Sequence, residues 1–383
     1  MKRKLLLSMG VVCSIVFYSC SKTATKEDQL LKTDELQAER RKGPQSSNCG
    51  CSTTDELNPI FDSLCLIAKN ATLQQLGSGF SFTEGPATDK FGNIFFTDQP
   101  NDKIYKWAAN NGQITLFKSN TGRSNGMYFD EEGYLITCAD MYGELRRYDK
   151  NGNYKVLVNG YKSKLLNGPN DVWVNPDNNG VYFTDPLFGR DYWDASDPRK
   201  VNLWPGTSQQ AANPPTTAPY FVGDLGGYVY YLSPNRKILT RIVTESLGWT
   251  PDKWPNGVIG TPDGKKLYVN KWDFNTDVSK TWVFDILPNG ALSNMKLFAN
   301  MGGDGMTMDE EGNVYIANNR GVTAFDKKGN RILNIPIPPG GSNNITFGDS
   351  DRKTLFITGQ DKIYGIRMKV KGAQKNQNNN PHH

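Results

Sequence analysis

The sequence predicts an all-β fold, a six-bladed β-propeller whose blades surround a central channel. Three observations support this prediction. A pair of strand-like runs joined by a Gly-containing turn occurs six times, and each pair precedes a third strand-like run with its own turn. The resulting unit of four short strands has a period of roughly 40 to 45 residues, which is typical of propeller blades. No long amphipathic helical pattern interrupts residues 71–371.

Apolar side chains recur at every second position of these runs, as at Ile94 and Phe96 or at Val314 and Ile316. This alternation between turn signals predicts strands. The six copies, aligned on their turns, are FTEGPATDKFGNIFFTD (82–98), RSNGMYFDEEGYLITCAD (123–140), GPNDVWVNPDNNGVYFTD (168–185), WPNGVIGTPDGKKLYVN (254–270), GGDGMTMDEEGNVYIAN (302–318) and SNNITFGDSDRKTLFITG (342–359).

The last blade ends at Val370 with only three strand-like runs. Residues 71–80 are therefore available as its fourth strand. A ring closed by this N-terminal strand has no free sheet edge. We expect one propeller domain over residues 71–371, followed by a polar tail over residues 372–383.

The N-terminus combines the basic string MKRK with a short apolar stretch. This stretch is too short for a transmembrane helix and predicts a signal peptide over residues 1–19. Its end resembles a bacterial lipobox, which implies cleavage before Cys20 and lipidation of that residue. An ordinary signal peptide with an incidental Cys is the alternative. We expect residues 20–70 to be a polar tether that holds the protein, lipid-anchored, in the bacterial cell envelope, at the periplasm or outer membrane.

Cleavage removes Lys2, Arg3 and Lys4 and lowers the formal charge from +5 to +2. So small and dispersed a charge predicts no nucleic-acid partner, and the membrane is expected to be contacted through the lipid anchor only.

Four cysteines remain after Cys20. Cys49, Cys51 and Cys65 cluster before the propeller and could form a disulfide in an oxidising compartment, although the C-x-C spacing also fits a metal or redox pair. Cys138 lies in a predicted strand and is expected to be a buried thiol.

Histidine occurs only at His382 and His383, in the polar tail. This excludes Ser-His-Asp and Cys-His catalysis and His-based zinc or copper sites from the propeller. Its chemistry must come from carboxylates, amides, hydroxyls, a Lys or a bound metal.

The aligned repeats place an oxygen-bearing side chain at one equivalent position in every blade. Equivalent positions in radially arranged blades lie on a ring, so these side chains can converge. Two carboxylates and several amides suit one hard divalent cation, with Ca²⁺ preferred and Mg²⁺ or Mn²⁺ as alternatives. Turn formation by Asn-Gly and Asp-Gly is the competing explanation. The six residues are Glu84, Asn125, Asn170, Asn256, Asp304 and Asn344.

Over residues 75–370 the chain resembles the SMP-30/gluconolactonase/LRE family, and its gluconolactonase branch in particular. The matching strings are FTEGP (82–86), LNGPNDVWV (166–174), YFTDPLFG (182–189), PNGVIGTPDGKKLYV (255–269), DGMTMDEEGNVYIA (304–317) and NNITFGDSDRKTLFIT (343–358).

The resemblance implies one divalent metal in the central channel, held by Glu84, Asn170, Asn256 and Asp304. Asn125 is then expected to line the channel and contact substrate. The chain departs from the family at residues 168–169, where Gly-Pro stands in place of a basic residue that relatives often carry.

The resemblance also implies a metal-dependent lactonase that hydrolyses a sugar (aldono-) lactone to the aldonic acid. Asp304 and Asn170 are the expected catalytic residues, and Asp171 is expected to bind substrate or transfer a proton. The long aromatic segment between Pro186 and Gly227 suggests a lid in which Arg190 and Trp193 contact the sugar. The alternatives are hydrolysis of organophosphates or other esters at the same metal site, and a non-catalytic ligand-binding propeller lipoprotein.

Overall fold

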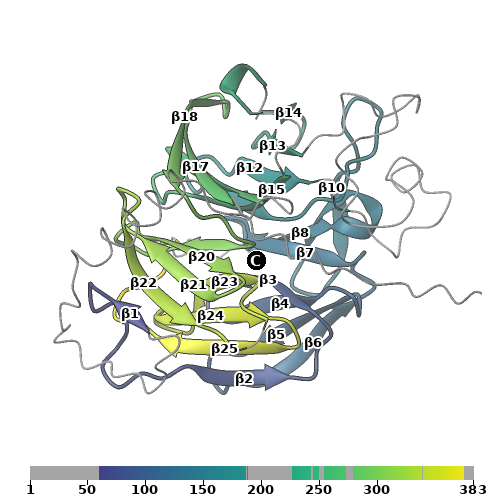
Figure 1. Ribbon diagram of the computed structural model, residues 1–383. Helices are drawn as coiled ribbons and strands as arrows, with labels where there is room; N and C mark the ends of the chain where they lie inside the picture. The colour runs from purple at the N-terminus through teal and green to yellow at the C-terminus, as the bar shows by residue number, and fades with distance from the viewer. Residues whose placement is uncertain are drawn as a thin grey trace, which may run out of the picture. The chain divides into compact units, whose positions relative to one another are not determined.

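The propeller is built from six antiparallel sheets arranged about a common centre, in a computed structural model (Figure 1). The predicted six-bladed fold is therefore confirmed. The structure describes residues 60–186, 188, 227–242, 245–249, 254–272, 279–338 and 340–374, all within the compact unit formed by residues 48–383.

The blades are numbered in chain order of their innermost strands. Blade 1 contains β3 (Thr83–Thr88), β4 (Ile94–Asp98), β5 (Lys103–Trp107) and β6 (Ile114–Ser119); blade 2 contains β7 (Ser124–Phe129), β8 (Leu135–Ala139), β9 (Glu144–Tyr148) and β10 (Tyr154–Val158); and blade 3 contains β11 (Val172–Val174), β12 (Val181–Asp185), β13 (Tyr228–Leu232) and β14 (Leu239–Arg241).

Blade 4 contains β15 (Trp254–Gly260), β16 (Lys266–Trp272), β17 (Lys280–Ile286) and β18 (Leu292–Ala299); blade 5 contains β19 (Met306–Met308), β20 (Val314–Asn318), β21 (Gly321–Phe325), β22 (Arg331–Pro336) and β1 (Phe61–Asp62); and blade 6 contains β23 (Asn344–Gly348), β24 (Thr354–Gly359), β25 (Lys362–Arg367) and β2 (Gln74–Ser78). Two short 3₁₀ helices, η1 (Asp140–Tyr142) and η2 (Glu245–Leu247), complete the described elements.

A recurring Asp-x-x-Gly-Asn turn connects strands within the blades. In the turn after β3, Asp89 Oδ1 accepts the backbone N–H groups of Phe91 and Asn93 at 2.8 and 2.9 Å, and Asp89 Oδ2 accepts from Asn93 Nδ2 at 2.8 Å. Gly92 has a φ of 84°, which L-residues with a side chain rarely adopt. The same hydrogen bonds recur around Asp149, Asp309 and Asp326.

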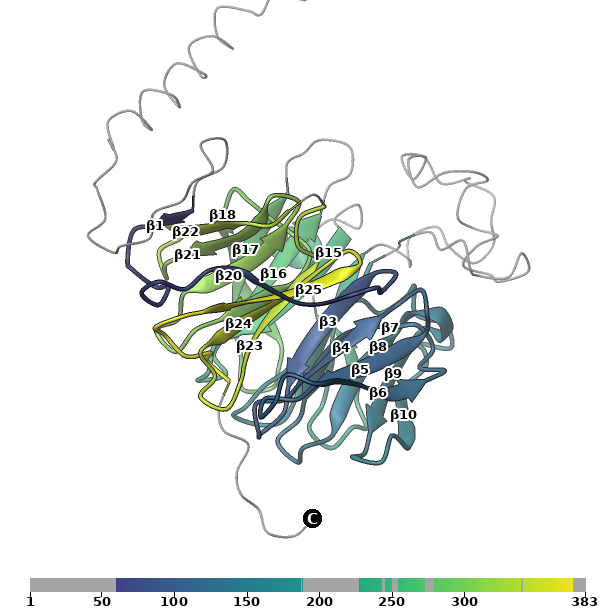
Figure 2. The same cartoon turned by 90° about the horizontal axis from the view of Figure 1, so that it is seen from below.

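The N-terminal segment contributes strands to two blades. β2 pairs with β25 and is the outer strand of blade 6, as expected for residues 71–80. β1 pairs with β22 as a fifth strand of blade 5, at the edge of the sheet in Figure 2. Asp62 stabilises the turn that follows, because its two carboxylate oxygens accept the N–H groups of Leu66 and Ile67, both at 2.8 Å.

The limits of the propeller differ from those expected. Leu66 and Ile67, within the expected tether, are buried in the core between blades 5 and 6. At the other end, Ala373 N donates to Met308 O at 2.9 Å, so the packed chain continues into the expected polar tail. Both ends pack because a few apolar or small residues can be buried once their backbone N–H and C=O groups are paired. Such pairing cannot be predicted from the composition of a segment.

The cysteines of the described region agree with their expected roles. Cys138 is a buried free thiol in β8, and burial raises its pKa well above the usual range. Cys65 is disulfide-bonded; Cys49 and Cys51 lie outside the described residues. In the part of the chain that the structure describes, no helix is long and apolar enough to span a membrane.

Candidate metal and active site

The six repeat-equivalent residues lie at the same end of the six inner strands. Glu84 and Asn125 are the second residues of β3 and β7, Asn344 begins β23, and Asn256 is the third residue of β15. Asn170 and Asp304 precede β11 and β19 by two residues. The inner strands contact one another in a closed circle, each touching the next blade's inner strand. These residues form the inner ring, in which all but the partly buried Asp304 are 3% to 6% exposed.

Hydrogen bonds across every interface between blades fix the inner ring. Five backbone or side-chain groups next to ring residues donate to a carbonyl of the neighbouring blade, and one donates to a carboxylate. The bonds are Thr97 Oγ1 to Asn125 O (3.3 Å), Gly126 N to Asn170 O (2.7 Å), Val258 N to Asp171 Oδ2 (3.2 Å), Gly257 N to Asp304 O (2.7 Å), Gly305 N to Asn343 O (2.8 Å) and Asn343 Nδ2 to Thr83 O (3.0 Å).

One residue directly follows the ring residue in each blade. Four of the six blades have Gly at this position, and only blade 3 has a charged residue there, Asp171. One of these glycines makes room for it. A Cβ at Gly126 would lie 2.3 Å from Asp171 Oδ1 and 2.6 Å from Asn170 O, so no larger residue fits without displacing them. The Asp171 carboxylate thus lies between blade 2 and the Val258 N–H of blade 4.

Three carboxyl groups of the site influence one another. Burial, and then the charge of Asp304, raise the pKa of Glu84 well above its usual range, although the Gly85 N–H and the Asn344 amide oppose the shift. Burial raises the pKa of Asp171 to about 7 against the N–H groups of Val258 and Val172, and Asp304 adds to the increase. Ionising all three groups together is therefore costly without a compensating cation.

The side chains present fit a hard divalent cation. Asn256 Oδ1 is buried and has no hydrogen-bond partner among the described residues, which is costly for a carbonyl oxygen unless another group binds it. Within the described ranges, no group of three or more His, Cys, Asp or Glu side chains is placed to hold a metal. A cation bound by Glu84 and Asp304 would therefore need amide oxygens as further ligands, an all-oxygen set that suits Ca²⁺ better than Zn²⁺.

Three predicted functional residues lie outside the described residues: Cys20, Arg190 and Trp193. The expected lid and the lipid anchor thus remain predictions. An aromatic residue near the ring was not singled out from the sequence. Trp254 begins β15, two residues before Asn256, and packs edge-to-face with Phe188 at a ring-centroid distance of 6.1 Å. Its position in the repeat, two residues before a ring residue, could have indicated from the sequence that it lies near the ring.

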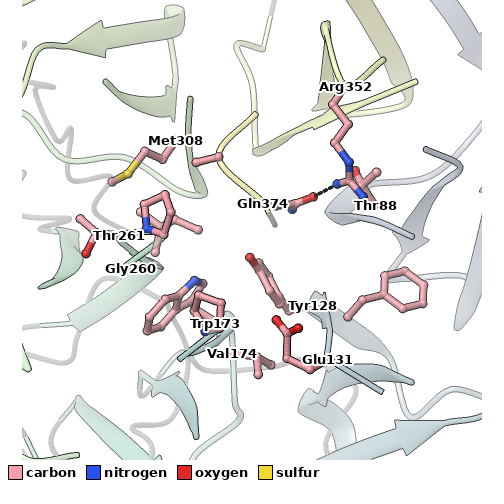
Figure 3. Close-up of a pocket in the computed structure, with 15 residues that line it drawn as sticks. Thr88, Tyr128, Glu131, Trp173, Val174, Gly260, Thr261, Met308, Arg352 and Gln374 are labelled. Atoms are coloured by element: carbon pink, nitrogen blue, oxygen red, sulfur yellow. Dashed lines mark hydrogen bonds between the residues drawn. The ribbon is translucent and has the colours of Figure 1, made fainter. Parts of the chain in front are cut away.

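A separate pocket lies at the opposite ends of the inner strands (Figure 3). Thr88, in its lining, ends β3 four residues after Glu84, about 13 Å along an extended strand. Arg352 Nη1 donates to Gln374 Oε1 there at 3.1 Å. No inner-ring residue lines this pocket, so we assign it no part in the site. Other lining residues labelled in Figure 3 include Tyr128, Trp173, Val174 and Met308.

Fold and site together define a six-bladed β-propeller protein with a buried, oxygen-lined ring at its axis. Residues 82–360 match the SMP-30/Gluconolactonase/LRE-like family model, and the chain belongs to this family. It is 25% identical over 400 residues to a gluconolactonase of Zymomonas mobilis, covering 97% of this chain and 99% of that relative.

Two solved structures are similar to the propeller. A gluconolactonase of Xanthomonas campestris superposes with a TM-score of 0.65 at 26% identity, over 81% of this chain and 95% of that protein. Regucalcin of Agrobacterium tumefaciens, a calcium-binding protein, superposes with a TM-score of 0.58 at 16% identity, over 79% of this chain and 95% of that protein. The second similarity shows the shared fold only.

Proposed function

We propose that the protein is a metal-dependent lactonase that hydrolyses a sugar lactone to the corresponding aldonic acid. The observation that carries the proposal is the inner ring at the propeller axis, which holds two carboxyl groups and the buried Asn256 Oδ1, an oxygen with no hydrogen-bond partner among the described residues. The similarity to a gluconolactonase along nearly the whole chain supports lactones as substrates.

Glu84, Asn170, Asn256 and Asp304 would hold the cation, and calcium is our first choice because all four ligands are oxygens. Magnesium or manganese are the alternatives. A cation bound there would act as a Lewis acid that polarises the lactone carbonyl and stabilises the negative charge that develops on its oxygen.

The chain's own residues would orient the substrate and transfer protons. Asn170, and Asn125 of the neighbouring blade 2, would contact the lactone and its hydroxyls through their ring amides. Asp304, as a ligand, would be a weak base, so we assign proton transfer to Asp171, a carboxylate next to the ring that is not a ligand and whose pKa is raised chiefly by burial. Asp171 would accept a proton from the water that attacks the carbonyl carbon, and return it to the ring oxygen when the C–O bond breaks.

A hydrolysis screen tests the proposal. The full chain would be assayed against aldonolactones of five and six carbons, before and after chelation, with calcium, magnesium or manganese added back. We expect hydrolysis of at least one lactone, lost on chelation and restored by a single type of ion. Chelator-resistant hydrolysis would contradict the metal role. Turnover of a phosphotriester but of no lactone would favour a different hydrolase at the same site.

We also propose that the protein is anchored in the bacterial cell envelope by a lipid on Cys20. The lipobox-like sequence and the polar residues that follow it support this location. Cys20→Ala should abolish processing and shift the protein out of the membrane fraction. Unchanged fractionation and electrophoretic mobility would exclude lipidation at this residue.

A further inference from the structure

Asn344 holds the ring position of blade 6, but its side-chain amide is bound to protein groups on both sides. Its Oδ1 accepts the Ile345 N–H at 2.8 Å, and its Nδ2 donates to Glu84 Oε2 at 3.3 Å. Thr358 fixes the backbone, because its Oγ1 accepts the Asn344 N–H at 2.9 Å and donates to Asn344 O at 3.0 Å.

The orientation of this amide follows from its partners. Exchanging its oxygen and nitrogen would place the oxygen against the Glu84 carboxylate and the NH₂ group against the Ile345 N–H. The contact with Ile345 would then join two donors, and the contact with ionised Glu84, the form that binds a cation, would join two acceptors. Asn344 therefore presents a donor to the ring.

Asn256, at the equivalent position of blade 4, has an available acceptor oxygen, whereas Asn344 presents a donor. Its Oδ1 is buried without a hydrogen-bond partner among the residues described, whereas Asn344 Oδ1 is bound to its own strand. Within the described part of the chain, the same residue type thus supplies an unbound acceptor in one blade and a donor in another. The repeat nominates both as ligands, but the hydrogen bonds distinguish them.

The Asn344 amide helps to fix the orientation of the Glu84 carboxylate. Glu84 Oε2 accepts two hydrogen bonds, from Gly85 N at 2.9 Å and from Asn344 Nδ2. Two donors on one oxygen orient the carboxylate and leave Oε1 as the oxygen available to a ligand. Gly305 of blade 5 preserves this arrangement, because a Cβ there would lie 1.9 Å from Asn344 Oδ1.

We propose that Asn344 is a positioning residue that orients the Glu84 carboxylate for cation binding and is not itself a ligand. The inference rests on the proposed metal site. Partners that hydrogen-bond a metal ligand typically contribute about 10- to 100-fold to metal affinity. Asn344 should contribute by this amount, and only through Glu84.

Calcium titration calorimetry on the metal-stripped full chain tests this role. Asn344→Leu, which keeps the shape and removes the donor, should weaken calcium binding by about 10- to 100-fold. Thr346→Val is the matched control: it removes a buried hydroxyl from the same strand, where Thr346 contacts Thr88 and not Glu84, and should leave the affinity unchanged. The thermal midpoint without metal is measured for both, and Asn344→Ser replaces the Leu variant if that variant does not fold.

A double-mutant cycle shows whether Asn344 acts through Glu84. Glu84→Asp keeps a charge, so calcium binding stays measurable, but withdraws the carboxylate from Asn344. Adding Asn344→Leu to Glu84→Asp should then cost little further affinity. Additive losses would overturn the positioning role, as would wild-type affinity in Asn344→Leu. A wild-type chain that binds no calcium, magnesium or manganese would instead overturn the metal site itself, and this inference with it.

Discussion

Individual ring residues share a position in the repeat but differ in what their side chains contact. Glu84 is held by two donors, and Asn256 keeps a buried acceptor without a partner among the described residues. Asp171 lies one residue beyond the ring and touches both neighbouring blades. The role of each ring residue therefore depends less on its residue type than on which of its polar atoms have no protein partner and can bind a ligand.

Removing either ring carboxylate should weaken cation binding. Glu84→Gln or Asp304→Asn should each lower calcium affinity by on the order of 100-fold, because affinity depends on ligand charge. Without metal, Glu84→Gln should raise the thermal midpoint at neutral pH. The raised pKa of Glu84 means that folding becomes less favourable as pH rises from the ordinary Glu pKa towards the raised one, because the unfolded chain loses this proton first; Gln carries no such cost.

Calorimetry and thermal unfolding of the stripped protein check both statements. Asp361→Asn, at an exposed residue with a long ion pair of 3.7 Å to Lys362, should change neither quantity. Equal calcium affinity in Glu84→Gln and wild type would remove Glu84 from the ligand set.

Asp171→Asn should separate chemistry from metal binding. If Asp171 transfers the proton, kcat on the best lactone should fall by about 100-fold or more, while calcium affinity changes far less than in Glu84→Gln. Steady-state kinetics at saturating calcium provide the measurement. A loss confined to KM would instead assign Asp171 to substrate binding.

At the scale of strands and turns, the sequence predicted the blades well because the recurring turns have a recognisable pattern of residues. The Asp89 turn and its three repeats combine a carboxylate, a Gly of positive φ and an Asn amide at fixed offsets. β1 was not predicted, since two residues carry no periodicity and their pairing with β22 joins segments about 270 positions apart. Long-range pairing of this kind leaves little trace in local sequence.

The inner strand of blade 2 provides a test of close packing. Gly126→Ala would place a Cβ 2.3 Å from Asp171 Oδ1 and 2.6 Å from Asn170 O. We expect a loss of about 1–3 kcal/mol in the free energy of unfolding, together with weaker calcium binding, because both displaced groups belong to the site. Chemical denaturation and calorimetry would measure the two effects. Loss of stability with unchanged affinity would show that the ring adjusts independently of this contact.

For the whole molecule, the repeat predicted which residues converge but not how each is used. Glu84, Asn170, Asn256 and Asp304 were selected by alignment of the blades and by family resemblance. The donor role of Asn344 depends on a contact with Glu84 across the closure of the ring, 260 positions away in sequence. Such a role requires side-chain orientations, which neither spacing nor composition specifies.

The C-terminal segment ties two blades together at the end of the propeller away from the ring. Lys371 O accepts the Glu310 N–H of blade 5 at 2.8 Å, and Gly372 N donates to Arg352 O of blade 6 at 3.0 Å. A Cβ at Gly372 would lie 2.3 Å from Phe347 Cβ in the core. Gly372→Ala should therefore displace the segment and lower the free energy of unfolding by about 1–3 kcal/mol.

Lys371→Ala is the matched control, because Lys371 is exposed and its backbone hydrogen bonds remain; it should change stability by less than about 0.5 kcal/mol. Calcium affinity should stay at the wild-type value in both variants, since the segment and the inner ring lie at opposite ends of the inner strands. Denaturant unfolding and calorimetry measure these outcomes. Wild-type stability in Gly372→Ala would mean that the segment can detach without cost, and weakened calcium binding would mean that the two ends of the propeller are coupled.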